Sequence, residues 1–121
     1  GSHHAEDPGR VAQFAKLNRY HVQMLAYLIR KLSEIKEADQ TLLDHSLVLY
    51  GSNMGNSNQH LHYDVPHVLI GGASGRLKGD RHLAFASRTV PTGNLLLSIL
   101  DIFDVRADRF GDSTGRLEGI S

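Results

Sequence analysis

Three residues with metal-binding side chains alternate in a polar segment near the middle of the chain. His60, His62 and Asp64 stand two positions apart within the segment from Asn56 to His67. In an extended backbone, alternate side chains point to the same side, so we expect these three to share one face. Imidazoles and carboxylates are common zinc ligands. The pattern predicts a metal site or, as the alternative, a polar loop in which these side chains only form hydrogen bonds.

A second group of imidazoles stands at the start of the sequence, in Ser2-His3-His4. Two adjacent histidines can supply further metal ligands. The alternative is that these residues are a remnant of a purification tag. His21, in line with apolar residues of the first expected helix, is interpreted as a hydrogen-bonded core residue, and the isolated His45 and His82 are likewise not taken as ligands.

Two glycine-containing segments are candidates for substrate contacts. The segment Gly51 to Gly55 follows an expected strand, and its Ser52 and Asn53 either contact a ligand or simply form the turn. The segment from residue 71 to residue 82 combines glycines with Arg76 and Lys78, which can hold an anion together with backbone amides. This second segment lacks the Gly-Lys-Ser/Thr ending of a P-loop, and a solvated hairpin is the alternative.

Composition narrows the class of protein. The chain has 121 residues, of which 40% are hydrophobic and 21% are charged, so we expect one soluble domain or a piece of one. Thirteen basic residues balance thirteen acidic ones, which gives no indication of a nucleic-acid partner. No apolar run is long enough to span a bilayer. Cysteine is absent, which excludes disulfides, thiolate metal sites and cysteine nucleophiles.

The order of predicted elements indicates an α/β fold. Asp7 and Pro8 start a long amphipathic helix that continues to about Lys36. Apolar runs predict strands, and a helix that is apolar nearly all round is expected near the end of the chain. The expected elements are a helical turn at 41–44, buried strands at 46–50 and 67–70, a short strand at 83–87, a buried helix at 92–103 with Thr92 as its N-cap, and an irregular tail at 104–121.

Two or three strands make a poor sheet by themselves, so the buried strands and the last helix need partners. We therefore expect residues 1–121 to be a single incomplete domain.

Several stretches together resemble a bacterial family named for a His-x-x-Ser-His-His motif. The stretches are Ser2-His3-His4, LNRYHV, LLDHSLVLYGSNM, HLHYDVPHVLIGG, LKGDRH, NLLLSILD and FGDSTGRL. The resemblance covers essentially the whole chain and corresponds to the C-terminal part of that family. It implies that His3 and His4 are native, that an N-terminal portion is left out, and that the protein is exported to the periplasm or beyond. The chain shows no signal peptide.

The layout also resembles that of alkaline-phosphatase-like and sulfatase-like hydrolases. This resemblance implies a C-terminal fragment of an alkaline-phosphatase-like sandwich. In that group an Asp-His pair of metal ligands follows a buried strand and a later histidine completes the site. Here Ser52 and Asn53 occupy the place of the pair, and His60 or His62 matches the later histidine.

Two hypotheses follow. In the first, the chain is part of a metal-assisted hydrolase of phosphate or sulfate esters, acting on an anionic small molecule or polymer. A zinc, calcium or magnesium ion would be held by His60 and His62, by Asp64 as ligand or orienting group, and by His3 and His4. Ser52, Asn53, Arg76 and Lys78 would contact the substrate. In the second, the chain is a non-catalytic binding or assembly module on a hydrolase-like scaffold, as the missing Asp-His pair suggests. The oligomeric state is not indicated.

Overall fold

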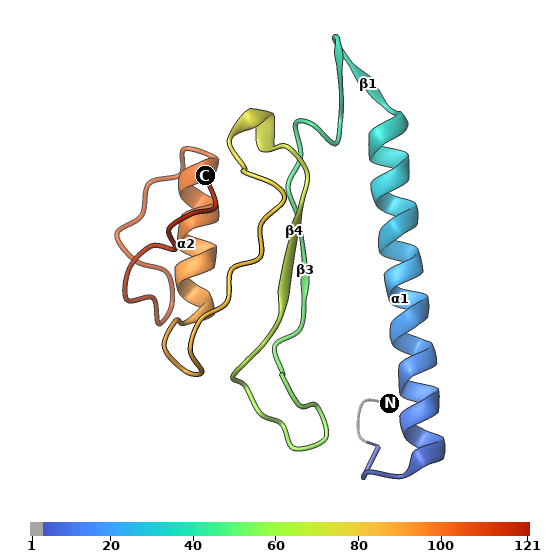
Figure 1. Cartoon of the computed structure of the whole chain (residues 1–121). Coiled ribbons are helices and arrows are strands. Elements are labelled where there is room, and N and C mark those ends of the chain that lie inside the picture. The colour runs from blue at the N-terminus through green and yellow to red at the C-terminus, as the bar shows by residue number, and fades with distance from the viewer. Residues whose placement is uncertain (1–3) are drawn as a thin grey trace. The chain divides into compact units, whose positions relative to one another are not determined.

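The computed structural model describes residues 4–121 and combines helices with short strands (Figure 1). The α/β composition predicted from the sequence is confirmed at this level. The elements, in chain order, are α1 (Pro8–Glu34), β1 (Lys36–Glu37), β2 (Gln40–Thr41), β3 (Val48–Gly51), β4 (His67–Ile70), the 3-10 turn η1 (Ala73–Gly75) and α2 (Thr92–Ile102).

Residues of the chain group into two compact units. Unit 1 comprises residues 1–42 and 49–68, and unit 2 comprises residues 43–48 and 69–121. No helix among residues 4–121 combines the length and the apolar character needed to cross a bilayer.

The start of α1 follows the sequence prediction. Asp7 is the N-cap, and its side chain accepts a hydrogen bond of 2.9 Å from the backbone N–H of Arg10. Pro8 takes the first helical position, where its missing N–H leaves no hydrogen bond unmade. The helix continues for 27 residues and ends at Glu34, two residues before the predicted end. His21 is exposed, so its prediction as a core residue was wrong.

The strands form two small antiparallel sheets of two strands each. In the first, β1 and β2 pair with Lys36 opposite Thr41 and Glu37 opposite Gln40. Neither strand was predicted, and the helical turn expected at 41–44 was wrong at Thr41, which lies in β2. The second sheet pairs β3 with β4. The bounds of β4 agree with the predicted strand, whereas β3 begins two residues later and ends one residue later than the strand predicted at 46–50.

The prediction that β3 and β4 are buried on both faces was wrong. Along each strand, half-buried residues are interrupted by exposed ones, and Leu49 and Val68 are exposed. A sheet of only two strands has few neighbours to cover it, so an apolar run alone does not bury both faces. Residues 83–86 are irregular, so the strand predicted at 83–87 does not form. Residues 71–82 contain the turn η1 and no strand, so the hairpin considered for this segment does not form either.

Two adjacent glycines allow unit 2 to fold tightly at the end of β4. Gly71 has a φ of +119°, and a Cβ there would overlap the carbonyl oxygen of Ser46. A Cβ on Gly72 would overlap the carbonyl oxygen of Asp44. This close approach permits a hydrogen bond of 2.9 Å from the Ala73 N–H to the Ser46 carbonyl. The Gly71-Gly72 pair is therefore required by backbone contact.

The core of unit 2 forms around α2. The buried residues Ala73, Leu95, Ile102 and Ile120 cluster together, and five half-buried side chains pack against them: Leu47, Leu69, Leu77, Ile99 and Leu117. Leu97 is fully buried. The prediction of a buried C-terminal helix is confirmed. The helix begins at Thr92, so the N-cap is Pro91 and the prediction of Thr92 as cap was wrong by one position.

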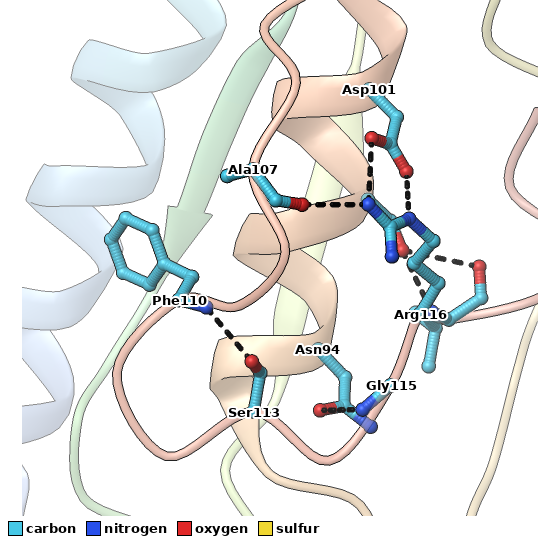
Figure 2. A network of polar contacts seen from close by, with 9 residues as sticks. Asn94, Asp101, Ala107, Phe110, Ser113, Gly115 and Arg116 are labelled. Carbon is cyan, nitrogen blue, oxygen red and sulfur yellow. Dashed lines mark hydrogen bonds and ion pairs between the residues drawn. The ribbon is translucent and has the colours of Figure 1, made fainter.

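The segment 104–121 contains no helix or strand, as predicted, yet buried polar groups of α2 hold it. The Asn94 side-chain oxygen accepts hydrogen bonds from the backbone N–H groups of Thr114 (2.8 Å) and Gly115 (3.4 Å). The Ser98 hydroxyl accepts one of 2.7 Å from the Leu117 N–H. Figure 2 shows Asn94 reaching toward Gly115 across the face of α2.

An ion pair between Arg116 and Asp101 also attaches the segment 104–121 to α2. The Arg116 Nε donates to one carboxylate oxygen of Asp101 at 2.5 Å and Nη2 to the other at 3.3 Å, while Nη2 also donates to the Ala107 carbonyl at 2.8 Å (Figure 2). The Lys78 N–H then donates to the Ile120 carbonyl at 2.9 Å. These bonds place Ile120 in the core.

Candidate functional site

The segment that contains the predicted metal ligands folds into tight turns. The Gly55 N–H donates to the Leu61 carbonyl (2.9 Å) and the Leu61 N–H donates to the Asn56 carbonyl (3.0 Å), so residues 57–60 form a turn. His60 and Asp64 have φ values of 56° and 55°. Both lie in the left-handed region, which histidine and aspartate enter more often than most residues do.

This geometry corrects the premise of an extended backbone from His60 to Asp64. Alternation places side chains on one face only where the backbone is extended throughout. His60, His62 and Asp64 are all exposed, and they follow the turns of the loop. Their sharing of one face does not follow from their spacing, and their use as ligands remains a prediction.

Asn56, which is not one of the predicted ligands, determines the conformation of this loop. The Asn56 side-chain oxygen accepts hydrogen bonds from the N–H groups of Asn58 (3.0 Å) and Gln59 (3.1 Å). This is an Asx turn, in which a side chain replaces a backbone acceptor. The Asn-Ser-Asn sequence was the signal that could have indicated it.

Asn58 joins the loop to the segment that precedes α1. The Ala5 N–H donates to the Asn58 side-chain oxygen at 2.8 Å, and the Asn58 amide nitrogen lies 3.5 Å from a carboxylate oxygen of Glu6. These contacts connect residues more than fifty positions apart within unit 1. The backbone next to His4 is thus attached to the loop that carries His60 and His62.

His4 itself is half-buried beside α1. Its Nδ1 accepts a hydrogen bond of 3.1 Å from the Glu6 N–H, and its ring centroid lies 6.1 Å from that of Phe14. These contacts fix the ring, and Nε2 is the nitrogen not used in the bond to Glu6. His3, the other predicted ligand of this pair, lies outside the described residues.

The predicted substrate contacts Ser52 and Asn53 are exposed at the end of β3. The Ser52 hydroxyl accepts a hydrogen bond of 3.1 Å from the Met54 N–H, so this side chain supports the turn. Both residues belong to unit 1, as do His4, His60, His62 and Asp64.

Gly51 and His67 stand at the two ends of the loop and pack against each other. A Cβ on Gly51 would overlap Nδ1 of His67 and lie 2.8 Å from the Pro66 carbonyl oxygen. Both ring nitrogens of His67 are buried, and neither has a hydrogen-bond partner among residues 4–121. An imidazole buried without partners is rare and normally has a structural or chemical reason. From the sequence, His67 was predicted only as the first residue of a strand.

The two predicted anion contacts belong to unit 2. Arg76 forms a bidentate ion pair with Asp104, with N–O distances of 2.9 and 2.8 Å. The hydrogen bond from Arg76 and then its charge lower the pKa of the Asp104 carboxyl from its ordinary value, and the same pair raises the pKa of Arg76. Lys78 is exposed, and its backbone N–H donates to the C-terminal segment. The ion pair uses two of the five N–H donors of the Arg76 guanidinium, and binding of a substrate anion by Arg76 stays a prediction.

Residues 4–121 contain no group of three histidine, aspartate or glutamate side chains placed so that they could hold one metal ion. The separate ligands named above therefore do not form a complete metal centre by themselves. Comparisons with models of protein families, with curated proteins and with solved structures find no match to this chain.

Proposed function

We propose that this chain supplies imidazole ligands to a metal-assisted hydrolase of phosphate or sulfate esters. The observation that supports the proposal best is the 2.8 Å hydrogen bond from the Ala5 N–H to Asn58. It attaches the backbone beside His4 to the loop of His60 and His62, so the two groups of histidines belong to one compact unit.

The donor types fit a divalent ion. Imidazole nitrogens and a carboxylate form the usual ligand set of catalytic zinc, which keeps one position open for water or substrate. The absence of a three-ligand group among residues 4–121 means that a further donor is needed. His3, outside the described residues, is the candidate for this donor.

In this proposal, each candidate residue of the chain has its own role. His60 and His62 hold the ion, and Asp64 is a ligand or orients one of the imidazoles. Ser52 and Asn53, exposed at the end of β3, contact the substrate. A bound ion polarises the ester and lowers the pKa of a water or hydroxyl nucleophile.

The resemblance to alkaline-phosphatase-like hydrolases belongs to the same proposal, as does export from the cell. The order of helix, strand, polar loop, strand and buried helix supports the resemblance. On this view the β3–β4 sheet is part of a larger sandwich.

Hydrolysis of phosphate and sulfate ester panels, with zinc, magnesium or calcium added to metal-free protein, tests the activity. We expect metal-dependent turnover that falls by a factor of roughly 100 or more in His62→Ala, the loss typical of a removed metal ligand or its support. His82→Ala, an exposed histidine of unit 2, is the matched control and keeps full activity. Equal turnover in both variants would contradict the role of His62.

A non-catalytic binding module is the second candidate, and one observation favours it. His60 and Asp64 have left-handed backbones in tight turns, and Ser52 supports a turn where the hydrolases carry a metal ligand. On this view the histidines order the loop for a partner. Absence of turnover with every ester and metal, together with full stability after metal removal, would favour this candidate.

A further inference from the structure

The long helix α1 carries an apolar stripe that the rest of unit 1 does not bury. Six of its large apolar side chains are between 42% and 54% exposed. Val22 lies on another side of the helix, and the other five are Leu17, Tyr20, Met24, Tyr27 and Leu28. We call these five residues the outer stripe. Their spacing of three and four positions puts them on one side of the helix.

A second apolar row on α1 is less exposed than the outer stripe. Phe14, Leu25, Ile29 and Leu32 are the half-buried residues of the helix. At 3.6 residues per turn, the centre of this row lies roughly 100° around the axis from the centre of the outer stripe. The outer stripe therefore borders this half-buried row along one side and is the more exposed part of the apolar face. No residue of α1 is fully buried.

Charge is distributed unevenly between α1 and the remainder of the chain. The helix carries five basic residues and one acidic residue, and the acidic residue, Glu34, is its last. The rest of the sequence holds eight basic and twelve acidic residues. The neutral total of the whole chain thus conceals a strongly basic helix.

Cations stand directly beside the outer stripe. The Arg30 guanidinium lies 5.5 Å and the Lys31 ammonium 5.4 Å from the centre of the Tyr27 ring. Long basic side chains that lie over aromatic rings keep their charge at the boundary between an apolar surface and water. Lys16 adds a third cation on the same helix.

We propose that α1 binds an anionic lipid surface through the outer stripe. A helix of this kind lies flat in the headgroup region, with its apolar face toward the acyl chains and its cations toward lipid phosphates. Tyrosines are well suited to this depth because their rings are apolar and their hydroxyls polar. The 27 residues form one unbroken helix of about 40 Å, which gives a straight contact with a flat surface (Figure 1).

Charge complementarity favours the lipid surface over a contact between the α1 helices of two copies. Each Lys or Arg near an anionic membrane adds to the attraction, and α1 offers five. Two of them, Arg30 and Lys31, also lie 3.9 and 3.8 Å from the carboxylate of Glu34, the one acidic residue of the helix. A second copy of this chain would bring the same positive charge to the contact if the two helices packed together.

Sedimentation with vesicles tests the proposal. The protein is mixed with vesicles of phosphatidylglycerol and phosphatidylcholine, or of phosphatidylcholine alone, at low and high salt. We expect binding to the anionic vesicles to exceed binding to the neutral ones by a factor of roughly ten or more and to weaken with salt. The triple variant Leu17→Gln/Met24→Gln/Leu28→Gln loses this binding.

The matched control changes three exposed apolar residues of unit 2, in the variant Leu83→Gln/Phe85→Gln/Val105→Gln. This variant keeps the wild-type binding. Circular dichroism of both triple variants checks that α1 remains helical. Equal binding of the two triple variants would overturn the proposal.

A fluorescence experiment locates the contact on the helix. The sequence contains no tryptophan, so Tyr20→Trp introduces a single reporter. We expect its emission to shift to the blue on anionic vesicles, as the ring leaves water. No shift, or a protein that forms oligomers through the stripe and ignores vesicles, would overturn the proposal; oligomers lost in the first triple variant would assign the stripe to a second copy.

Discussion

Two segments without helix or strand, the C-terminal segment 104–121 and the histidine loop 52–66, use their polar residues in opposite ways. The buried side chains of Asn94 and Ser98 in α2 accept hydrogen bonds from the backbone of the C-terminal segment. Ile120 of this segment lies in the core of unit 2. The histidine loop is shaped mostly by its own turns, and His60, His62 and Asp64 are exposed.

The difference shows that irregular backbone is not evidence of a function or of its absence. In the C-terminal segment, polar groups satisfy backbone donors that would otherwise be buried without partners. In the histidine loop, chemically capable side chains stand at the surface of a folded turn, where a ligand can reach them. The loop is therefore the better place for a site.

The largest loss of stability is expected at Ile120, in the C-terminal segment. Shortening this buried side chain in Ile120→Ala should lower the free energy of unfolding by about 3 kcal/mol, because it leaves a cavity in the core. Leu61→Ala, at a half-buried position of the histidine loop, should cost about 1 kcal/mol. Denaturant unfolding measures both. Equal losses would show that the two segments are equally integrated.

A smaller loss of stability is expected when the hydrogen bonds from the C-terminal segment to the Asn94 side chain, here called the polar clamp, are removed. Asn94→Ala leaves the Thr114 and Gly115 N–H groups without their acceptor and should cost about 2 kcal/mol. The exposed Asn53 of the histidine loop provides the control, because Asn53→Ala should change stability by less than about 0.5 kcal/mol. Hydrogen exchange at residues 114 and 115 should accelerate only in the first variant; unchanged exchange there would argue against the clamp.

The next largest loss of stability is expected where the two ends of the histidine loop pack against each other. A methyl group in Gly51→Ala would overlap the His67 ring and should cost about 1 to 2 kcal/mol. Gly79 has open space around its Cα, so Gly79→Ala should be neutral or slightly stabilising. Thermal unfolding compares the two, and a Gly51→Ala protein as stable as wild type would mean that the contact with His67 is unimportant.

The smallest predicted effect is a pH dependence of unit 2. Because Arg76 lowers the pKa of Asp104 in the folded chain, the pair stabilises the fold above the ordinary aspartate pKa of about 4. This contribution is lost as the pH falls through the lowered value. Denaturant midpoints measured from pH 5 downward should fall less steeply in Asp104→Asn than in wild type. Identical pH dependence in the two proteins would show that the ion pair does not contribute to stability.

The sequence predicted elements well where local signals and packing agree. Asp7 and Pro8 specify the start of α1, and the apolar residues of the last helix specify the burial of α2. The apolar runs of β3 and β4 predicted strands, but burial depends on the number of neighbouring strands, which local sequence does not contain.

The candidate site was less accessible to prediction. The spacing of His60, His62 and Asp64 indicated one face only under the assumption of an extended backbone, and Asx-turn chemistry at Asn56 overrides that assumption. The attachment through Asn58 depends on a contact across more than fifty residues, which no local pattern encodes.

The central claim is that the histidine loop and the start of the chain hold a divalent ion together. NMR of the imidazole nitrogens during a zinc titration of metal-free protein tests this claim most directly. The account predicts that, of the eight histidines, His60, His62 and those at the N-terminus shift together and saturate at one equivalent of zinc. Shifts that never saturate, or saturation that persists unchanged in His62→Ala, would contradict it.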